Sequence, residues 1–135
     1  ALTALTNAAL RGVQVKLIVP EMSDSRIVTA AARSYFKELQ DAGVLVFEYR
    51  GRMFHAKTLL VDELYGMVGS ANFDNRSFRL NFEVMAVVIE RDFNQRLAAM
   101  FDDDLSQCKL VPAGRQSPPH QRLFEAVARL GSPLL

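Results

Sequence analysis

Residues 54–72 read FHAKTLLVDELYGMVGSAN and contain two short stretches that alternate between apolar and polar residues. We expect strands at 53–62 and 65–70, because a period of two places successive side chains on opposite faces of a strand. Only Glu63 and Leu64 separate the two stretches, which predicts a tight connection between them. Side chains two positions apart share a face, so His55 and Lys57 are expected to point the same way.

The sequence around this stretch predicts strands and helices in alternation. An Ala- and Leu-rich helix ends at Gly12, and a second helix, with Ser23 or Asp24 as its N-cap, ends at Gly43. We also expect strands at 13–20, 44–50 and 82–90 and helices at 91–108 and 120–130. Residues 72–81 are expected to form a loop or a helical turn. The strand at 82–90 is nearly continuous in apolar residues and is expected to be buried. The order predicts an α/β fold with a mixed β-sheet flanked by helices.

Composition limits the classes of function. The chain has 135 residues, half of them hydrophobic, which fits one globular domain or part of one. A net charge of +1 argues against binding nucleic acid through a large basic field. The single cysteine, Cys108, cannot form an internal disulfide. The sequence shows no signal peptide and no apolar run as long as a membrane span. It begins inside a predicted helix and without Met, so we expect a fragment of a longer protein.

His55 and Lys57 on one face predict an anion site. Burying an imidazole or an ammonium without a partner costs several kcal/mol, roughly 2–7 for a polar group and more for a charge. A phosphate between the two side chains removes that penalty, because lysine supplies a point charge and histidine exchanges protons or attacks near neutral pH. The second stretch ends in Gly69, Ser70 and Asn72: the glycine allows close backbone approach, and the other two present donors for phosphate oxygens. Glu83 can accept an imidazole N–H and fix the tautomer.

The spacing H-x-K-x4-D-x6-G-S-x-N, formed by His55, Lys57, Asp62, Gly69, Ser70 and Asn72, resembles the HKD motif of the phospholipase D superfamily. The longer run at 54–84 is similar to the second such motif of bacterial cardiolipin synthases. The resemblance covers essentially the whole chain. It implies one half of a two-lobed fold: residues 1–111 would be a C-terminal HKD catalytic half-domain lacking its first strand, and 112–135 a linker and amphipathic helix.

The resemblance also implies a reaction in two steps. One histidine attacks the phosphodiester phosphorus to form a phosphohistidine, while a second histidine protonates the leaving alcohol. Lys57 and Asn72 would hold the phosphoryl oxygens, with Ser70 assisting. Glu83 would orient an imidazole, and Asp62 would complete the catalytic motif behind the reacting groups. The chemistry requires no cofactor or metal. In cardiolipin synthases a phosphatidyl group passes from one phosphatidylglycerol to another, with release of glycerol.

The second histidine is the missing part of this mechanism. His120, the other histidine of the chain, lies in a proline-rich segment without an x-Lys partner, so we expect no catalytic role for it. The partner is therefore the N-terminal HKD half of the same polypeptide or a second copy of this chain. In two-motif enzymes the second-motif histidine usually serves as general acid, but the sequence alone leaves His55 as nucleophile or acid. A fragment with one motif is expected to be inactive alone.

Other residues have competing interpretations. Gly69, Arg76, Ser77 and Asn81 are candidate pocket-wall residues, and core packing is favoured over a lipid-facing groove for Phe73, Phe78 and Phe82. Leu123, Phe124, Val127 and Leu130 form an apolar stripe that suits either an interfacial membrane contact or packing on the domain, and we favour packing. Asp102–Asp104 is expected to be a solvated acidic patch. The side chains of consecutive residues on a helix point in different directions, which argues against a shared metal site.

The main hypothesis is a cardiolipin synthase-like phosphatidyltransferase whose longer parent lies at the bacterial inner membrane. The alternatives are a phospholipase D or homodimeric nuclease of the same superfamily, which uses water as acceptor, and an inactive scaffold half-domain. The intact histidine and lysine favour an enzyme over a scaffold. The near-neutral charge makes nucleic acid an unlikely partner and a phospholipid at a membrane surface the expected one.

Overall fold

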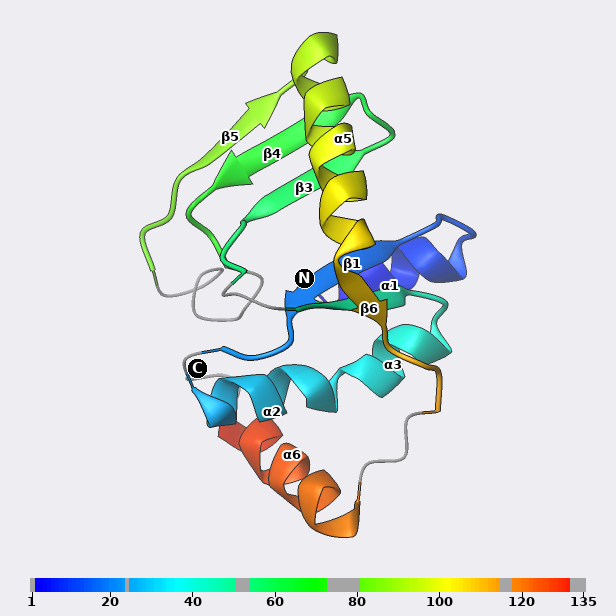
Figure 1. Cartoon of the computed structure of the whole chain (residues 1–135), viewed down its shortest axis with the longest axis vertical. Coiled ribbons are helices and arrows are strands. Elements are labelled where there is room, and N and C mark those ends of the chain that lie inside the picture. The colour runs from blue at the N-terminus through cyan, green and yellow to red at the C-terminus, as the bar shows by residue number, and fades with distance from the viewer. Residues whose placement is uncertain (1, 24, 51–53, 73–80, 115–117, 132–135) are drawn as a thin grey trace.

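The structure is a computed structural model that describes residues 2–23, 25–50, 54–72, 81–114 and 118–131, with the side chain of Arg122 left out (Figure 1). The described elements follow in the order α1 (Leu2–Leu10), β1 (Lys16–Pro20), α2 (Arg26–Ser34), α3 (Phe36–Asp41), β2 (Leu45–Tyr49), β3 (Thr58–Val61), β4 (Tyr65–Gly69), β5 (Met85–Val88), α5 (Arg91–Ser106), β6 (Cys108–Leu110) and α6 (Pro119–Gly131). None of these helices is long and apolar enough to cross a bilayer.

The strands form two three-stranded sheets. The first has the order β1-β2-β6, with β1 parallel and β6 antiparallel to β2. The second has the order β3-β4-β5 and is antiparallel throughout. Helix α5 contacts strands of both sheets and crosses one face of the second (Figure 1). The α/β class is confirmed, although the strands lie in two sheets and β6 replaces the predicted end of the helix at 91–108.

The main core lies around the first sheet. Its buried members are Phe36, Leu39, Val44, Val46 and Val111, and α1 packs against them through Leu2, Leu5 and Ala9. The parallel β1–β2 pair follows from the helical crossover between them, since parallel strands require a long connection. A separate small cluster joins α2 to α6.

The predicted helix over 23–43 is two helices. Tyr35 ends α2 with φ −90° and ψ −11° and at the same time begins α3. The N-cap of α2 is Ser25, so the predicted cap at Ser23 is wrong, and Asp24 lies outside the described residues. The Ser23 hydroxyl instead lies 3.0 Å from Thr29 Oγ1 and donates to the Ser25 carbonyl at 2.8 Å, which braces the entry to the helix.

The β3–β4 hairpin has a left-handed turn. Asp62 and Glu63 have φ values of 51° and 54°, and the Leu64 N–H donates to the Val61 carbonyl at 3.0 Å. Positive φ at both central positions is the signature of a type I′ turn, whose twist matches that of the flanking strands. Aspartate is among the residues that tolerate this conformation, because its short side chain bonds locally.

The second sheet leaves one face open. Gly66, on the covered face, lies against the side chains of Asn94 and Leu97 of α5. The opposite face consists of apolar residues that are neighbours across the strands, and we call it the apolar sheet face: Leu59, Val61, Tyr65, Met67, Met85, Val87 and Ile89. Val87 is 57% exposed and Ile89 is 72% exposed. The prediction of a buried strand at 82–90 is therefore wrong for this chain.

Candidate active site

His55 and Lys57 lie in the segment that leads into β3, which begins only at Thr58. The predicted strand start at residue 53 is therefore wrong, although the Gly69 N–H donates to the Lys57 carbonyl at 3.2 Å and extends the pairing by one step. The two side chains meet as expected: Lys57 Nζ lies 2.8 Å from His55 Nε2. Nζ also donates to the His55 carbonyl at 3.1 Å.

This contact brings a ring nitrogen of the imidazole next to the lysine amine. Which of the two nitrogens donates depends on the tautomer of the ring. The His55 side chain is exposed and Lys57 is half-buried, so both are accessible from solvent. Lys57 Nζ contacts two atoms of His55 and has three N–H donors, so at least one of them can meet an anion.

Ser70 and Glu83 form a second polar pair. Ser70 Oγ donates to Glu83 Oε2 at 2.5 Å, and Asn81 Nδ2 donates to Glu83 Oε1 at 3.2 Å. The backbone holds the serine from both sides: its N–H donates to the Val84 carbonyl, and the Val84 N–H donates to Oγ, each at 3.0 Å. The hydrogen bond from an imidazole to Glu83 stays a prediction, and the described contacts assign Glu83 to Ser70 and Asn81.

Gly69 is required by the sheet. A Cβ at this position would lie 2.1 Å from the Val84 carbonyl oxygen and 2.9 Å from Met85 Cα. Both neighbours are backbone atoms, so they cannot yield as the end of a flexible side chain would. The glycine therefore allows β5 to approach β4 and brings Ser70 within reach of Glu83. The candidate pocket-wall role of Gly69 stays a prediction, and the described contacts add a role in strand packing.

Comparison with known proteins places this site in a family. The family described as cardiolipin synthase, phospholipase D-like domain, matches residues 1–105. The chain belongs to this cardiolipin synthase, phospholipase D-like family. Cardiolipin synthase A of Pseudomonas aeruginosa is 46% identical over 136 residues, and cardiolipin synthase 2 of Bacillus anthracis is 43% identical over 136 residues. Each alignment covers 99% of this chain but 28% and 26% of the relative, so the chain spans about a quarter of their length.

Solved structures of the phospholipase D type share the fold. The crystal structure of the phospholipase D family member Nuc from Salmonella typhimurium superposes with a TM-score of 0.70 at 23% identity, covering 83% of this chain and 73% of that one. NucT from Helicobacter pylori gives 0.63 at 18% identity, with 81% and 72% covered.

The remaining residues of the family motif lie at different distances from the histidine. Asp62 is exposed in the hairpin turn, at the end of β3 remote from His55; four strand residues at about 3.3 Å each separate that turn from Lys57. Its geometry fits a turn residue and places it away from the imidazole.

Asn72 is exposed, two residues beyond Ser70. Arg76 and Ser77 lie outside the described residues, as do Phe73 and Phe78. Phe82 is fully exposed, so its predicted core position is wrong.

Sequence reasoning missed two polar residues with structural roles. Asn94 is fully buried in α5, and its Nδ2 donates to the carbonyls of Leu64 at 2.7 Å and Val88 at 3.2 Å. It thereby ties the hairpin turn and β5 to the helix. The sequence feature that could have identified Asn94 is a polar residue three positions before Leu97, on the apolar side of a helix. Glu90 is the N-cap of α5: its carboxylate accepts the N–H groups of Asp92 and Phe93, which lowers the pKa of Glu90.

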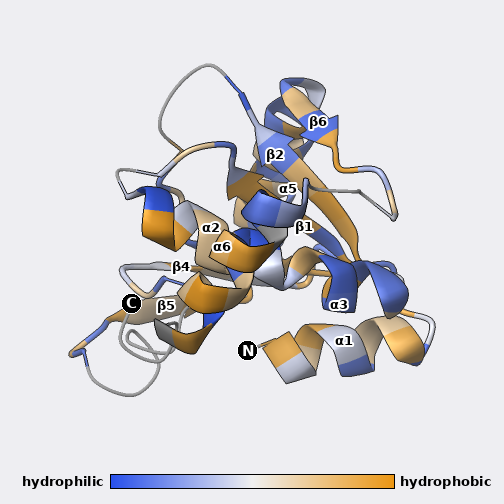
Figure 2. Ribbon diagram, turned by 90° about the horizontal axis from the view of Figure 1, so that it is seen from below, coloured by the Kyte–Doolittle hydropathy of each residue, from blue (hydrophilic) through white to orange (hydrophobic). Residues whose placement is uncertain are grey.

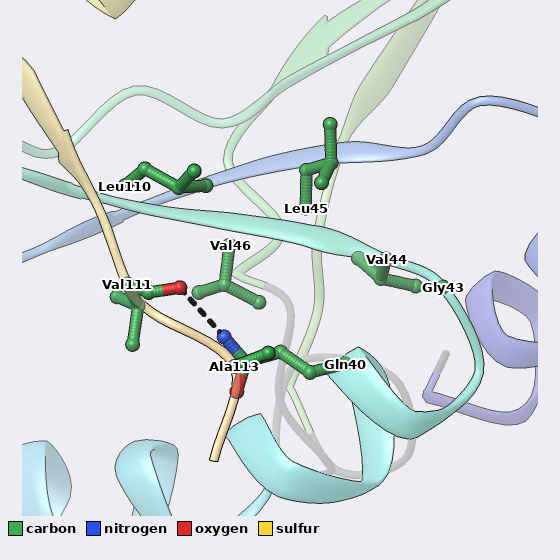
Figure 3. Close-up of a pocket in the computed structure, with 8 residues that line it drawn as sticks. All are labelled: Gln40, Gly43, Val44, Leu45, Val46, Leu110, Val111 and Ala113. Carbon is green, nitrogen blue, oxygen red and sulfur yellow. Dashed lines mark hydrogen bonds between the residues drawn. The ribbon is translucent and has the colours of Figure 1, made fainter. Parts of the chain in front are cut away.

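Two cavities among the described residues lie away from the motif. One of about 160 Å³ is lined mainly by apolar residues such as Val44, Val46 and Val111, and Gln40 Nε2 crosses it to donate to the Val111 carbonyl at 2.8 Å (Figure 3). Neither this cavity nor the larger groove between α2 and α6 includes a predicted site residue. Among the described residues there is also no group of His, Cys, Asp and Glu side chains that could hold a metal ion.

Proposed function

We propose that this chain is the second-motif half of a cardiolipin synthase-like phosphatidyltransferase. The observation that carries the proposal is the contact of His55 Nε2 with Lys57 Nζ at 2.8 Å, accessible from solvent. This pairing holds a proton-exchanging nitrogen next to a fixed positive charge, as phosphoryl transfer demands. The cardiolipin synthases that align with nearly the whole chain support the choice of substrate.

The proposed reaction balances as two displacements at phosphorus. A histidine nitrogen of the partner half attacks the phosphorus of phosphatidylglycerol, and the bond from phosphorus to the glycerol oxygen breaks. His55 donates a proton to that oxygen, so glycerol leaves and a phosphohistidine remains. His55 then takes the proton from a hydroxyl of a second phosphatidylglycerol, whose oxygen displaces the histidine from phosphorus. Cardiolipin forms, and both histidines return to their starting state.

Two other groups stabilise the charge on the phosphoryl oxygens in this proposal. Lys57 directs an Nζ proton at one of these oxygens, while Asn72 supplies amide donors from the segment after β4. Ser70 is held by Glu83 Oε2 and by the Val84 N–H, so its oxygen has a fixed position. Ordering these groups before the reaction lowers the barrier, because donors that are already placed need no reorganisation.

The partner half is proposed to pack on the apolar sheet face. Lys57 and Glu83 precede Leu59 and Met85 by two positions, so strand alternation predicts them at the end of this same face. A second HKD half that covers exposed Val87 and Ile89 would therefore bring its own histidine beside His55. Large contiguous apolar surfaces are typical of protein interfaces. The longer parent is proposed to act at the bacterial inner membrane, where its lipid substrates lie.

A chimeric enzyme tests the function. Residues 1–135 replace the aligned region of Pseudomonas aeruginosa cardiolipin synthase A, a substitution that the 136-residue alignment makes nearly one for one. The chimera is incubated with phosphatidylglycerol vesicles, and lipid and water-soluble products are separated. The matched control is a chimera with Lys57→Met, which keeps the length of the side chain and removes its charge.

The products decide between the acceptors. Cardiolipin and free glycerol in equal amounts support the transferase, and their loss with Lys57→Met supports the assigned site. Phosphatidic acid and glycerol without cardiolipin would mean that water is the acceptor, and the transferase would be replaced by a phospholipase. A chimera that folds but forms neither product would contradict the proposal.

A further inference from the structure

Helix α6 presents its apolar side to solvent. Its contact with α2 runs through the small residue Ala128, which is 5% exposed and packs with Ala30 and Ala31. Leu123 and Leu130 are 68% and 83% exposed, and Val127 is 57% exposed. At 100° per residue these three lie within one stripe, on the side of the helix remote from Ala128. The expectation that the stripe packs on the domain is therefore wrong.

The stripe lies at one end of the molecule. In Figure 1, α6 is the outermost element beyond α2, and in the view from that end hydrophobic segments of α6 face the reader (Figure 2). Phe124, 48% exposed, extends the apolar side toward a groove of about 330 Å³ that it lines together with Met22 and Arg26. Met22 is itself 74% exposed, so the apolar surface continues from α6 onto the segment before α2.

The C-terminal segment has a basic balance in sequence. Residues 112–135 contain three arginines and one acid, Glu125, and Arg26 lines the groove beside Phe124. The side chain of Arg129 is 45% exposed while it binds Glu38 at 2.8 Å and lies 4.5 Å from the centre of the Tyr35 ring. These contacts fix one side of the helix to α2 and α3 and leave the stripe facing outward. An amphipathic helix with an apolar stripe and a basic balance suits an anionic lipid interface.

We infer that the exposed stripe of α6 is a membrane-contact surface that lies in the interface of an anionic bilayer. The choice of a lipid surface as occupant rests on the proposed function, whose substrates are anionic phospholipids, and on the positive balance of the segment. Among the described residues, the apolar sheet face is thus proposed for a protein partner and the α6 stripe for lipid.

Vesicle co-sedimentation of the 135-residue chain tests this inference. The chain is mixed with phosphatidylserine, phosphatidylglycerol or phosphatidylcholine vesicles. We expect binding to both anionic lipids and much less to phosphatidylcholine. Leu123→Glu and Leu130→Glu should each weaken binding at least about tenfold, because a leucine side chain leaves the apolar phase and a negative charge enters the interface. Both residues are exposed, so circular dichroism should be unchanged.

A matched variant on α5 separates binding through the stripe from general adsorption. Met100→Glu changes an apolar residue of α5 that is 63% exposed and should leave vesicle binding as it is. Equal weakening by Met100→Glu and Leu123→Glu would mean adsorption of any apolar surface and would overturn the inference.

Absence of binding to anionic vesicles would also overturn it, as would self-association of the chain through α6 in the absence of lipid. Binding to phosphatidylglycerol but not to phosphatidylserine would assign the contact to the active site. Binding can succeed where the chimera is inactive, so the two proposals fail separately.

Discussion

Ser70 and Glu83, thirteen positions apart, are joined by a hydrogen bond of 2.5 Å from Oγ to Oε2. The bond links the end of β4 to the segment before β5, and Gly69 makes it possible because it allows the two backbones to approach. The same carboxylate accepts from Asn81. We therefore propose Glu83 as a positioning residue that holds a serine hydroxyl near the phosphoryl group of the proposed reaction.

Replacing this carboxylate should lower activity without unfolding the domain. In the chimera, Glu83→Gln removes the charged acceptor, and we expect kcat about tenfold to a hundredfold lower, since displacement of a positioned group by about 1 Å has this effect. Ser70→Ala should cost a similar factor, and the double variant little more, because the two residues act as one unit. Asp102→Asn, an exposed change on α5, is the control. Multiplicative losses in the double variant would contradict the coupling.

Gly66 should not tolerate a methyl group. A Cβ there would lie 2.3 Å from Asn94 Oδ1, and Asn94 is held by the carbonyls of Leu64 and Val88. We expect Gly66→Ala to lower the free energy of unfolding by about 1–3 kcal/mol, measured by urea denaturation. Asn94→Ala removes the clashing atom, so the double variant should lose less than the sum of the single variants. Additive losses would show that the two residues are not in contact.

The cap of α5 should give a pH-dependent contribution to stability. The N–H groups of Asp92 and Phe93 donate to Glu90, and the pKa of its carboxyl is lowered from 4.5 in the folded chain. The stabilisation is therefore present above the ordinary pKa of a glutamate and is lost as pH falls through the lowered value. Glu90→Gln should reduce the Tm at about pH 7, and the difference from wild type should shrink below about pH 4. A difference that is constant with pH would contradict the role of the charge.

The single cysteine should react slowly. Burial and the neighbouring Asp104 carboxylate raise the pKa of the Cys108 thiol, and Sγ donates to the Asp104 carbonyl at 3.1 Å. Only the thiolate attacks a disulfide reagent, so modification at about pH 8 should be slower than in the urea-unfolded chain. Asp104→Asn should accelerate the reaction in the folded state. Equal rates for folded and unfolded chains would contradict this account.

Local patterns predicted some elements well and others poorly, for physical reasons. Gly12 and Gly43 ended helices as expected, both with positive φ, because a C′ glycine acts within one turn. The polar pair His55 and Lys57 was identified from spacing alone, although the strand starts after it. The exposure of β5 and of the α6 stripe could not be predicted, since apolar patterns show that a surface is to be covered and not what covers it.

The polar contacts of the site depend on tertiary structure. Asn94 reaches Leu64 across thirty positions, and Ser70 meets Glu83 only because two strands pair in one register. A sequence shows the chemistry of each residue but not which of several acceptors lies nearest. The predicted partner of Glu83 was an imidazole for this reason, and the described contacts add a serine and an amide.

The most direct test of the account compares the two histidines in the chimera with Pseudomonas aeruginosa cardiolipin synthase A. His55→Ala and His120→Ala are assayed side by side for cardiolipin and glycerol release from phosphatidylglycerol vesicles. We predict that His55→Ala abolishes both products, a loss of at least about a thousandfold, because the variant lacks the proposed proton donor. His120→Ala, at the start of α6, should keep the activity of the unsubstituted chimera. A His55→Ala chimera as active as its parent would contradict the central claim.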